Sequence, residues 1–239
     1  MSWKINNQYN YPKSIRSIYN GARHYDVGGK KLPSVTHILS ITKSQKDKDA
    51  LNSWKKEVGF ASSAKISKEA SELGTKFHKF IEEILLGRMN EQLIQETNLP
   101  KKMAETIIEN GIKDRVSEVY GCEVVLYNDG PMGYAGTADA VIKSADDKVK
   151  ILDMKSSSKP KRREWSVINE YFLQCALYAI CHDKVYGTNI SSSEILMCTP
   201  NLIFQKFEIK DDEFDKIKKE AMLRVEQYYN LRNKEINYK

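Results

Sequence analysis

The chain has 239 residues, of which 41% are hydrophobic and 29% are charged. That profile is typical of a soluble globular protein with one domain, or with one domain and an appendage. No stretch approaches the ~18 consecutive apolar residues of a membrane-spanning helix, so that class of protein is excluded. The 38 Lys and Arg against 32 Asp and Glu give a net charge of +6, which is compatible with a polyanionic partner but does not identify one.

The opening segment is rich in Asn, Tyr and Gly, and it predicts an extended arm or a hairpin that turns at Gly28 and Gly29. Residues 1–25 contain basic side chains and no acid, but they resemble an organelle transit segment only faintly because an apolar face is missing. An apolar signal core and a small-residue cleavage site are missing too, which argues against secretion.

Three segments of the first half have apolar residues at helical spacing. Phe77, Ile81 and Leu85, for example, recur on one face of the second segment. The predicted helices cover residues 46–58, 61–86 and 99–120. We therefore expect the first half to be mostly helical.

The periodicity changes after Gly121. Two strand-like runs flank the turn sequence Asn-Asp-Gly-Pro at 128–131 and predict an antiparallel hairpin. A third strand, a helix, two more strands and a closing helix follow. In order, the predicted elements cover residues 122–127, 134–142, 148–155, 170–182, 194–198, 203–209 and 211–232. This order predicts an α/β fold with a sheet flanked by helices.

Four cysteines lie inside apolar runs: Cys122, Cys175, Cys181 and Cys198. They lack Cys-x-x-Cys spacing, which argues against a zinc ribbon and favours reduced thiols that pack in a core.

The strand over 148–155 carries Asp153 and Lys155 on one face, because side chains alternate along a strand. Such a pair can hold a divalent cation and orient a water molecule, although an isolated Asp-x-Lys is more often a surface ion pair. The preceding strand places Asp139 among small and apolar residues, where a lone carboxylate is costly unless it is paired or metal-bound. If the strands are neighbours, Asp139 and Asp153 converge on one ion; alternatively, Asp139 caps a turn or pairs with a lysine.

Thr75, His78 and Glu82 form one stripe of the helix over 61–86. A neutral imidazole is a common metal ligand, although a single helical histidine is more often a packed core residue. Gly74, directly before this stripe, would allow a close approach of backbone or substrate.

A loop of hydroxyl and basic side chains at 155–163 follows Asp153 directly. Residues 150–165 hold six Lys and Arg against two acids, which favours contact with phosphates over a solvated linker. Gln174 and Tyr178 lie one turn apart on the next predicted helix.

The order of these motifs resembles the PD-(D/E)xK nuclease superfamily, in its RecB-like exonuclease branch. The motifs are Gly-Thr-x-x-His-x-x-x-Glu, Gly-Thr-x-Asp, Asp-x-Lys-Ser-Ser and Gln-x-x-x-Tyr. Residues 33–39 and 153–160 also look like the mitochondrial genome maintenance exonuclease family and its phage relatives. The resemblance implies a restriction-endonuclease-like core with a central mixed sheet flanked by helices, over residues 61–239. Residues 1–60 would form an amino-terminal arm and a helical extension.

The resemblance implies a metal-dependent DNA exonuclease that prefers single strands with free ends. It places four ligands on Mg²⁺ or Mn²⁺: His78, Asp139, Asp153 and the Met154 carbonyl. The implied catalytic groups are Asp139, Asp153 and Lys155. The implied contacts with DNA are Thr75, Ser156, Ser157, Lys159, Gln174 and Tyr178. Glu123 also matches an acid of the family, and its role stays open.

Several RecB-like relatives carry an iron–sulfur cluster, but no cysteine precedes Cys122 and the later ones do not match, so we expect no cluster here. No Walker A sequence occurs, so no nucleotide cofactor is expected. Two alternatives stay open: a structure-specific DNA endonuclease on the same core, and a catalytically inactive nucleic-acid-binding subunit. We expect a location in the cytoplasm of a bacterial or phage-infected cell rather than in the mitochondrial matrix. The oligomeric state is not indicated.

Overall fold

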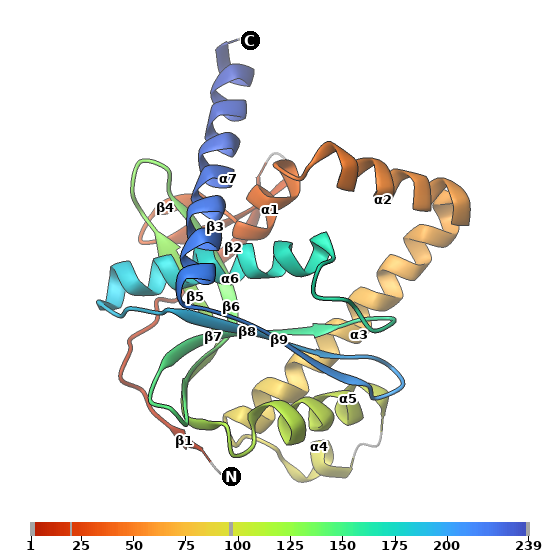
Figure 1. The fold of residues 1–239 in the computed structure, drawn as a ribbon, viewed down its shortest axis with the longest axis vertical. Coiled ribbons are helices and arrows are strands. Elements are labelled where there is room, and N and C mark those ends of the chain that lie inside the picture. The colour runs from red at the N-terminus through yellow and green to blue at the C-terminus, as the bar shows by residue number, and fades with distance from the viewer. Residues whose placement is uncertain (1–2, 20, 96–97, 238–239) are drawn as a thin grey trace.

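The computed structural model describes residues 3–19, 21–95 and 98–237. The predicted amino-terminal region, 1–60, and the predicted nuclease core, 61–239, each include a few residues outside this description. A six-stranded mixed sheet runs through the molecule in the order β1-β5-β6-β7-β8-β9, and a second sheet has the order β2-β3-β4 (Figure 1). None of the helices in the described part of the chain is long and apolar enough to cross a membrane.

The large sheet is built from an antiparallel meander extended on both sides. β5, β6 and β7 form the meander, β8 lies parallel to β7 after the crossover helix α6, and β9 returns antiparallel to β8. β1 pairs parallel with β5 at the other edge. The bounds are β1 Lys4–Ile5, β5 Val116–Asn128, β6 Tyr134–Ser144, β7 Val149–Ser156, α6 Ser166–Tyr186, β8 Ser192–Cys198 and β9 Phe204–Lys210.

Helices cover both faces of this sheet, with α6 and α7 (Asp211–Asn237) on one side and α3 (Phe60–Leu85) and α5 (Leu99–Ile107) on the other (Figure 1). Each side has its own hydrophobic cluster. β7 contributes to both because its side chains alternate: Ile151 packs with α6, whereas Leu152 and Met154 pack with α3 and α5. The predicted α/β class, with a central mixed sheet flanked by helices, is therefore confirmed.

The predicted helix over 99–120 is wrong in its second half. α5 passes into a π-helical turn, Ile108–Ile112, and β5 begins at Val116. The apolar spacing continues through Val116 and Val119 and so imitates a helix. Asp114, whose φ of 59° is left-handed, lies between the π-helical turn and β5 and ends the helical backbone.

The remaining predicted elements have counterparts, usually longer by a few residues. The helix over 46–58 is α2, Gln45–Val58, and α1 (Val35–Ile41) and α4 (Glu91–Gln95) are additional short helices. Three of the four cysteines, Cys175, Cys181 and Cys198, are buried in the two clusters as thiols.

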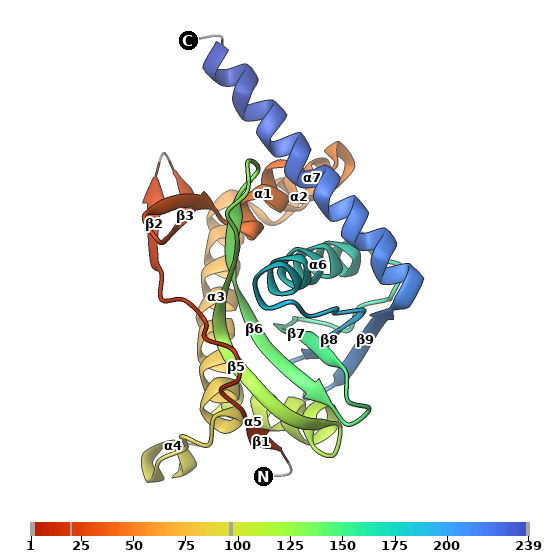
Figure 2. The same ribbon diagram turned by 90° about the vertical axis from the view of Figure 1, so that its left-hand side faces the viewer.

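The amino-terminal segment forms the small sheet from β2 (Ile15–Tyr19), β3 (Ala22–Val27) and β4 (Lys30–Pro33), which stands beside β5 and β6 (Figure 2). The predicted turn at Gly28 and Gly29 is confirmed, with φ of 59° and 80°, whereas β2 was not predicted. A bridge from Ser34 to Ala135 attaches this sheet to β6. The division of the chain at residue 60 stays a prediction.

Candidate metal centre and active-site cleft

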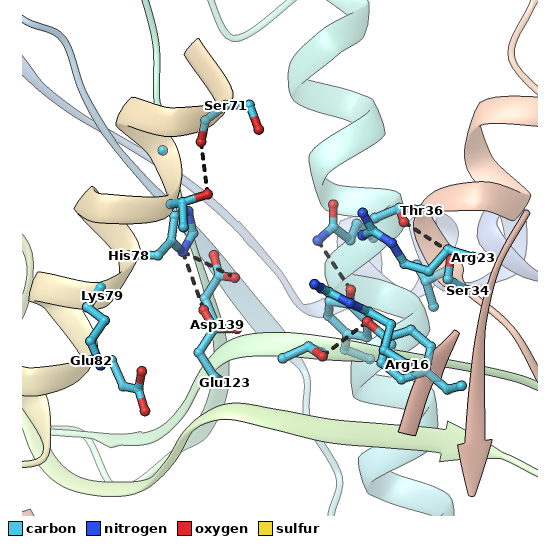
Figure 3. Close-up of a pocket in the computed structure, with 18 residues that line it drawn as sticks. Arg16, Arg23, Ser34, Thr36, Ser71, His78, Lys79, Glu82, Glu123 and Asp139 are labelled. Atoms are coloured by element: carbon cyan, nitrogen blue, oxygen red, sulfur yellow. Dashed lines mark hydrogen bonds and ion pairs between the residues drawn. The ribbon is translucent and has the colours of Figure 1, made fainter. Parts of the chain in front are cut away.

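A cleft of about 520 Å³ lies between α3, the large sheet, α6 and the small sheet. It collects side chains that are far apart in the sequence, as Figure 3 shows. The chemically important lining residues are Thr75 and His78 from α3, Glu123 from β5, Asp139 from β6, and Gln174 and Tyr178 from α6. Five of these six are predicted site residues, and Glu123 is the acid whose role the sequence left open.

The cleft reaches the sheet where β6 and β7 separate. Their last pair is Ala140 with Leu152, so Asp139 and Asp153 stand just beyond the paired region. Asp139 Oδ2 accepts a hydrogen bond of 2.7 Å from the Met154 backbone N–H, and this side chain thus replaces the missing strand partner. Asp139 is therefore fixed in orientation by the backbone of the neighbouring strand.

His78, Glu123 and Asp139 converge on one point. His78 Nδ1 lies 3.6 Å from Glu123 Oε1 and 3.6 Å from Asp139 Oδ1. One ligand atom from each of the three residues lies within 4.8 Å of the other two. Burial opposes the charged imidazolium, but Asp139 and Glu123 outweigh it, so the pKa of His78 is raised above its ordinary value.

Glu123 reaches this point through an uncommon backbone conformation. It lies between the pairs Cys122–Ala140 and Val124–Ala138, and so opposite Asp139. Its φ of 50° falls in the left-handed region, which residues with a side chain seldom occupy. Strain of this kind is often stored at functional sites.

Asp153 and Lys155 lie beside the cluster on the face of β7 that meets α6. Asp153 Oδ1 accepts hydrogen bonds from Lys155 Nζ at 2.6 Å and from Gln174 Nε2 at 3.3 Å. Lys155 Nζ also lies 5.0 Å from the centre of the Tyr171 ring, a cation–π contact that the sequence did not indicate.

The pKa values of Asp153 and Lys155 are both raised, but for different reasons. Burial raises the pKa of Asp153 to about 6, although the Lys155 ammonium opposes the shift. For Lys155, burial opposes the charge, but Asp153 and Asp139 outweigh it and raise the pKa of the ammonium. Lys155 is therefore a cation at neutral pH.

These residues fit a divalent cation. Asp153 is 2% exposed, and its Oδ2 is buried without a hydrogen-bond partner, which is costly for a carboxylate oxygen unless a cation compensates it. Carboxylates are suitable ligands for both Mg²⁺ and Mn²⁺, and an imidazole ligand favours Mn²⁺, the softer of the two ions. Of the predicted ligands, His78 and Asp139 meet within the three-residue cluster; Asp153 and Met154 adjoin it, and their ligation stays a prediction.

The predicted DNA contacts fall into two groups. Thr75, Gln174 and Tyr178 line the cleft, and Gln174 Nε2 donates a hydrogen bond of 3.3 Å to Tyr178 Oη. The other three lie outside the cleft lining. Ser156 is the last residue of β7, and its Oγ lies 3.5 Å from where a Cβ on Gly74 would stand, while Ser157 and Lys159 lie on the loop that follows. Ser157 Oγ donates to the Lys159 carbonyl, so it stabilises its own loop.

Two arginines in the cleft lining were not predicted as site residues. Arg16 and Arg23 lie on the wall opposite the His78 cluster (Figure 3). The only signal in the sequence was the run of basic residues without acids near the amino terminus.

No protein-family model matches this chain, and no curated protein does. Several solved structures resemble it, at low TM-scores. A candidate exonuclease from Eubacterium rectale has a TM-score of 0.44 at 16% identity, with 65% of this chain and 64% of that chain covered. The alkaline exonuclease LHK-Exo from Laribacter hongkongensis has a TM-score of 0.38 at 18% identity, with 67% and 81% covered, and its complex with dAMP gives the same TM-score. The protein SSO0001 has a TM-score of 0.33, with 55% of its length covered.

The chain spans less than two thirds of two of these proteins, SSO0001 and the Eubacterium rectale protein. The neighbours with a named activity are exonucleases. At such TM-scores and identities, these similarities do not establish an activity for this chain.

Proposed function

We propose that this chain is a metal-dependent nuclease that hydrolyses DNA phosphodiester bonds, acting as an exonuclease on single-stranded DNA with free ends. The observation that carries the proposal is the cluster of His78, Glu123 and Asp139 in a cleft, beside a buried Asp153 with one unpartnered oxygen. The preference for single strands and for ends rests on the motif resemblance. We also propose that the protein acts in the cytoplasm.

The chain's own residues hold and orient the reacting groups. A divalent cation bound at the cluster would polarise a phosphoryl oxygen and lower the pKa of a water molecule. Asp139, fixed by the Met154 N–H, keeps its other oxygen directed at the centre. Lys155 is a cation held by Asp153, and it would offset the negative charge that develops on the phosphate.

α6 supplies the positioning contacts in this scheme. Gln174 bonds both Asp153 and Tyr178, so it connects the buried acid to the cleft surface. Tyr178 and Thr75 would then contact the scissile strand from opposite sides of the cleft. We propose Mg²⁺ or Mn²⁺ as the cofactor. Mn²⁺ should sustain activity well, because the imidazole of His78 suits the softer ion.

The test is the release of nucleotides from linear single-stranded DNA labelled at the 5′ or the 3′ end, with a covalently closed single-stranded circle beside it. Hydrolysis is expected with Mg²⁺ or Mn²⁺, none with EDTA, and the circle is expected to survive. Asp153→Ala and Lys155→Ala should lose at least about 100-fold in rate. Lys148→Ala, on the turn before β7, is the matched control.

Each alternative predicts a different result. Cleavage of the circle would favour the structure-specific endonuclease. Binding of DNA without metal-dependent hydrolysis would favour the inactive subunit. If Asp153→Ala and Lys155→Ala degrade DNA as fast as the parent, the assignment of the site is wrong.

A further inference from the structure

A second cavity lies behind the small sheet, on the face that points away from the cleft. Its volume is about 190 Å³, and its walls come from β2 and β3 on one side and from α1 and α7 on the other. Drug-sized ligands occupy cavities of roughly 300–1,000 Å³, so this cavity suits a single ring system. The lining residues are Tyr19, Ala22, His24, His37, Ile41, Tyr228, Leu231 and Arg232.

The small sheet and α1 place this cavity back to back with the cleft. Side chains alternate along a strand, so Arg23 of β3 lines the cleft and its neighbour His24 lines the cavity. The same division occurs on α1, where Thr36 lines the cleft and His37 lines the cavity. Figure 3 shows Arg23 and Thr36 together on the cleft side. Because only the small sheet and one helix separate the two sites, a single DNA strand is long enough to contact both.

Each wall of the cavity carries a tyrosine and a histidine in edge-to-face contact. On the sheet side, the ring centres of Tyr19 and His24 are 5.8 Å apart and the rings stand at 89°. On the helical side, the ring centres of His37 and Tyr228 are 5.7 Å apart and the rings stand at 83°. Such contacts hold the rings of each pair at fixed angles. Four aromatic rings thus line a space of the size of one further ring system.

The charges around this cavity are positive. Its described lining residues include no acid, and Arg232 is the one with a permanent charge. Lys31 Nζ lies 5.4 Å from the centre of the Tyr19 ring and adds a second cation beside the cavity. Burial and, to a smaller extent, His24 lower the pKa of His37, so this ring is neutral at pH 7. Uncharged rings beside cations suit a nucleotide, because the base stacks on the rings and the cations attract the phosphate.

We propose that this cavity binds one nucleobase of the single-stranded DNA whose end lies in the cleft, stacked on the aromatic walls with the adjoining phosphate near Arg232. Every base has a π-face, so stacking adds affinity without selecting a sequence. The strand would then be held at a second point, outside the reacting centre. This inference rests on the proposed function, because it assigns a further contact of the same substrate.

Strands that lack single bases test the contact. Fluorescence anisotropy in EDTA compares an internally labelled single-stranded oligonucleotide with versions that are each abasic at a different position. Tyr19→Leu should bind the intact strand about tenfold more weakly than the parent does, and at one position the missing base should cost it nothing further. His37→Leu, on the opposite wall, should be insensitive at the same position. Ile15→Ala, an exposed residue of β2 outside the lining, should bind every strand like the parent.

A free mononucleotide offers the same rings and phosphate, so equilibrium dialysis with dAMP distinguishes the two sources. The parent and Tyr19→Leu should both bind dAMP more weakly than the strand, because the other contacts of a strand raise the effective concentration of its base at the cavity. If dAMP binds the parent as tightly as the strand does, and Tyr19→Leu loses that affinity, the cavity takes a free nucleotide and the inference is overturned.

The inference is also overturned if a missing base costs the two cavity variants as much as it costs the parent at every position, or if Ile15→Ala becomes insensitive at the same position as they do. Circular dichroism checks that the variants fold, which the partly exposed positions of Tyr19 and His37 favour. None of these measurements requires hydrolysis. Failure of the proposed function would appear instead as a parent that keeps the position-specific contact but does not hydrolyse DNA with Mg²⁺ or Mn²⁺.

Discussion

Asp139 and Met154 are joined by a hydrogen bond of 2.7 Å from the Met154 backbone N–H to Asp139 Oδ2, just beyond the last pair of the β6–β7 ladder. One carboxylate thus closes the gap between two diverging strands and presents its other oxygen to His78. The position combines a structural and a chemical role, and the two can be separated by substitution.

Asp139→Ala should lower the free energy of unfolding by about 1–3 kcal/mol, because it leaves the Met154 N–H without an acceptor. Asp139→Asn keeps an acceptor oxygen and should cost less than about 1 kcal/mol, yet it should lose at least about 100-fold in hydrolysis. Urea unfolding and the end-labelled assay measure the two effects. Equal losses of stability in both variants would contradict the role assigned to the hydrogen bond.

Glu123 has a left-handed φ of 50°, a conformation that costs roughly 1–2 kcal/mol for a residue with a Cβ. Glu123→Gly should therefore be more stable than Glu123→Gln by about 1 kcal/mol, since both remove the charge and only glycine removes the strain. Both variants should lose hydrolysis if Glu123 belongs to the metal centre. If Glu123→Gln hydrolyses DNA as fast as the parent, Glu123 does not belong to the metal centre and its role is purely structural.

Gly136 permits the position of Tyr178 in the cleft. A Cβ at Gly136 would stand 2.7 Å from Tyr178 Cε1 and 2.9 Å from Tyr178 Oη, which is too close for either atom to stay in place. Gly136→Ala should displace the ring and lower the hydrolysis rate by about tenfold or more. In a Tyr178→Ala background the same substitution should have little further effect, so a double-mutant cycle tests the coupling. Additive effects would show that Gly136 acts elsewhere.

His182 gives the stability of the protein a pH dependence away from the cleft. Its ring is fully buried, with Nε2 3.1 Å from Tyr11 Oη and Nδ1 2.8 Å from Thr188 Oγ1. Burial lowers the pKa of His182 to about 4, below its ordinary value of 6.5. Between pH 6.5 and pH 4 His182 is therefore protonated in the unfolded chain but neutral in the folded chain. The free energy of unfolding falls as the pH decreases through this range.

The corresponding variant is His182→Gln, which cannot titrate. Its free energy of unfolding should be lower than the parent's at pH 7, and the difference should shrink as the pH falls towards 4. Tyr11→Phe is the control, because it removes a hydrogen bond but keeps the titrating imidazole. A difference between the parent and His182→Gln that does not change with pH would contradict the buried neutral state.

Local patterns account for the parts of the fold that were predicted. The alternation that separates Asp153 from Met154 is a property of any strand, and the strand patterns before and after 128–131 identified the hairpin. The helix over 99–120 was overextended because Ile112, Val116 and Val119 satisfy helical spacing as well as strand burial. Only the turn at Asp114, with its left-handed φ, separates the helix from the strand, and its signal in the sequence is weak.

The candidate site was predicted where its residues belong to compact motifs, as with His78, Asp139 and Asp153. Glu123 could not be assigned, because its direction depends on a left-handed φ and on the register with β6. Arg16 and Arg23 reach the cleft only because the small sheet docks on β6 over a long separation in the chain. No periodicity within the sequence encodes such a long-range contact.

The pairing of β1 with β5 also has a consequence for synthesis. Lys4 and Ile5 pair with Glu118 and Val119, and Trp3 Nε1 donates to the Leu85 carbonyl. At translation rates of ~5–20 residues per second, these partners leave the ribosome on the order of ten seconds after the first residues. Until then β1 has no strand to pair with, so this edge of the large sheet forms only after the helices α1 to α5 have been synthesised.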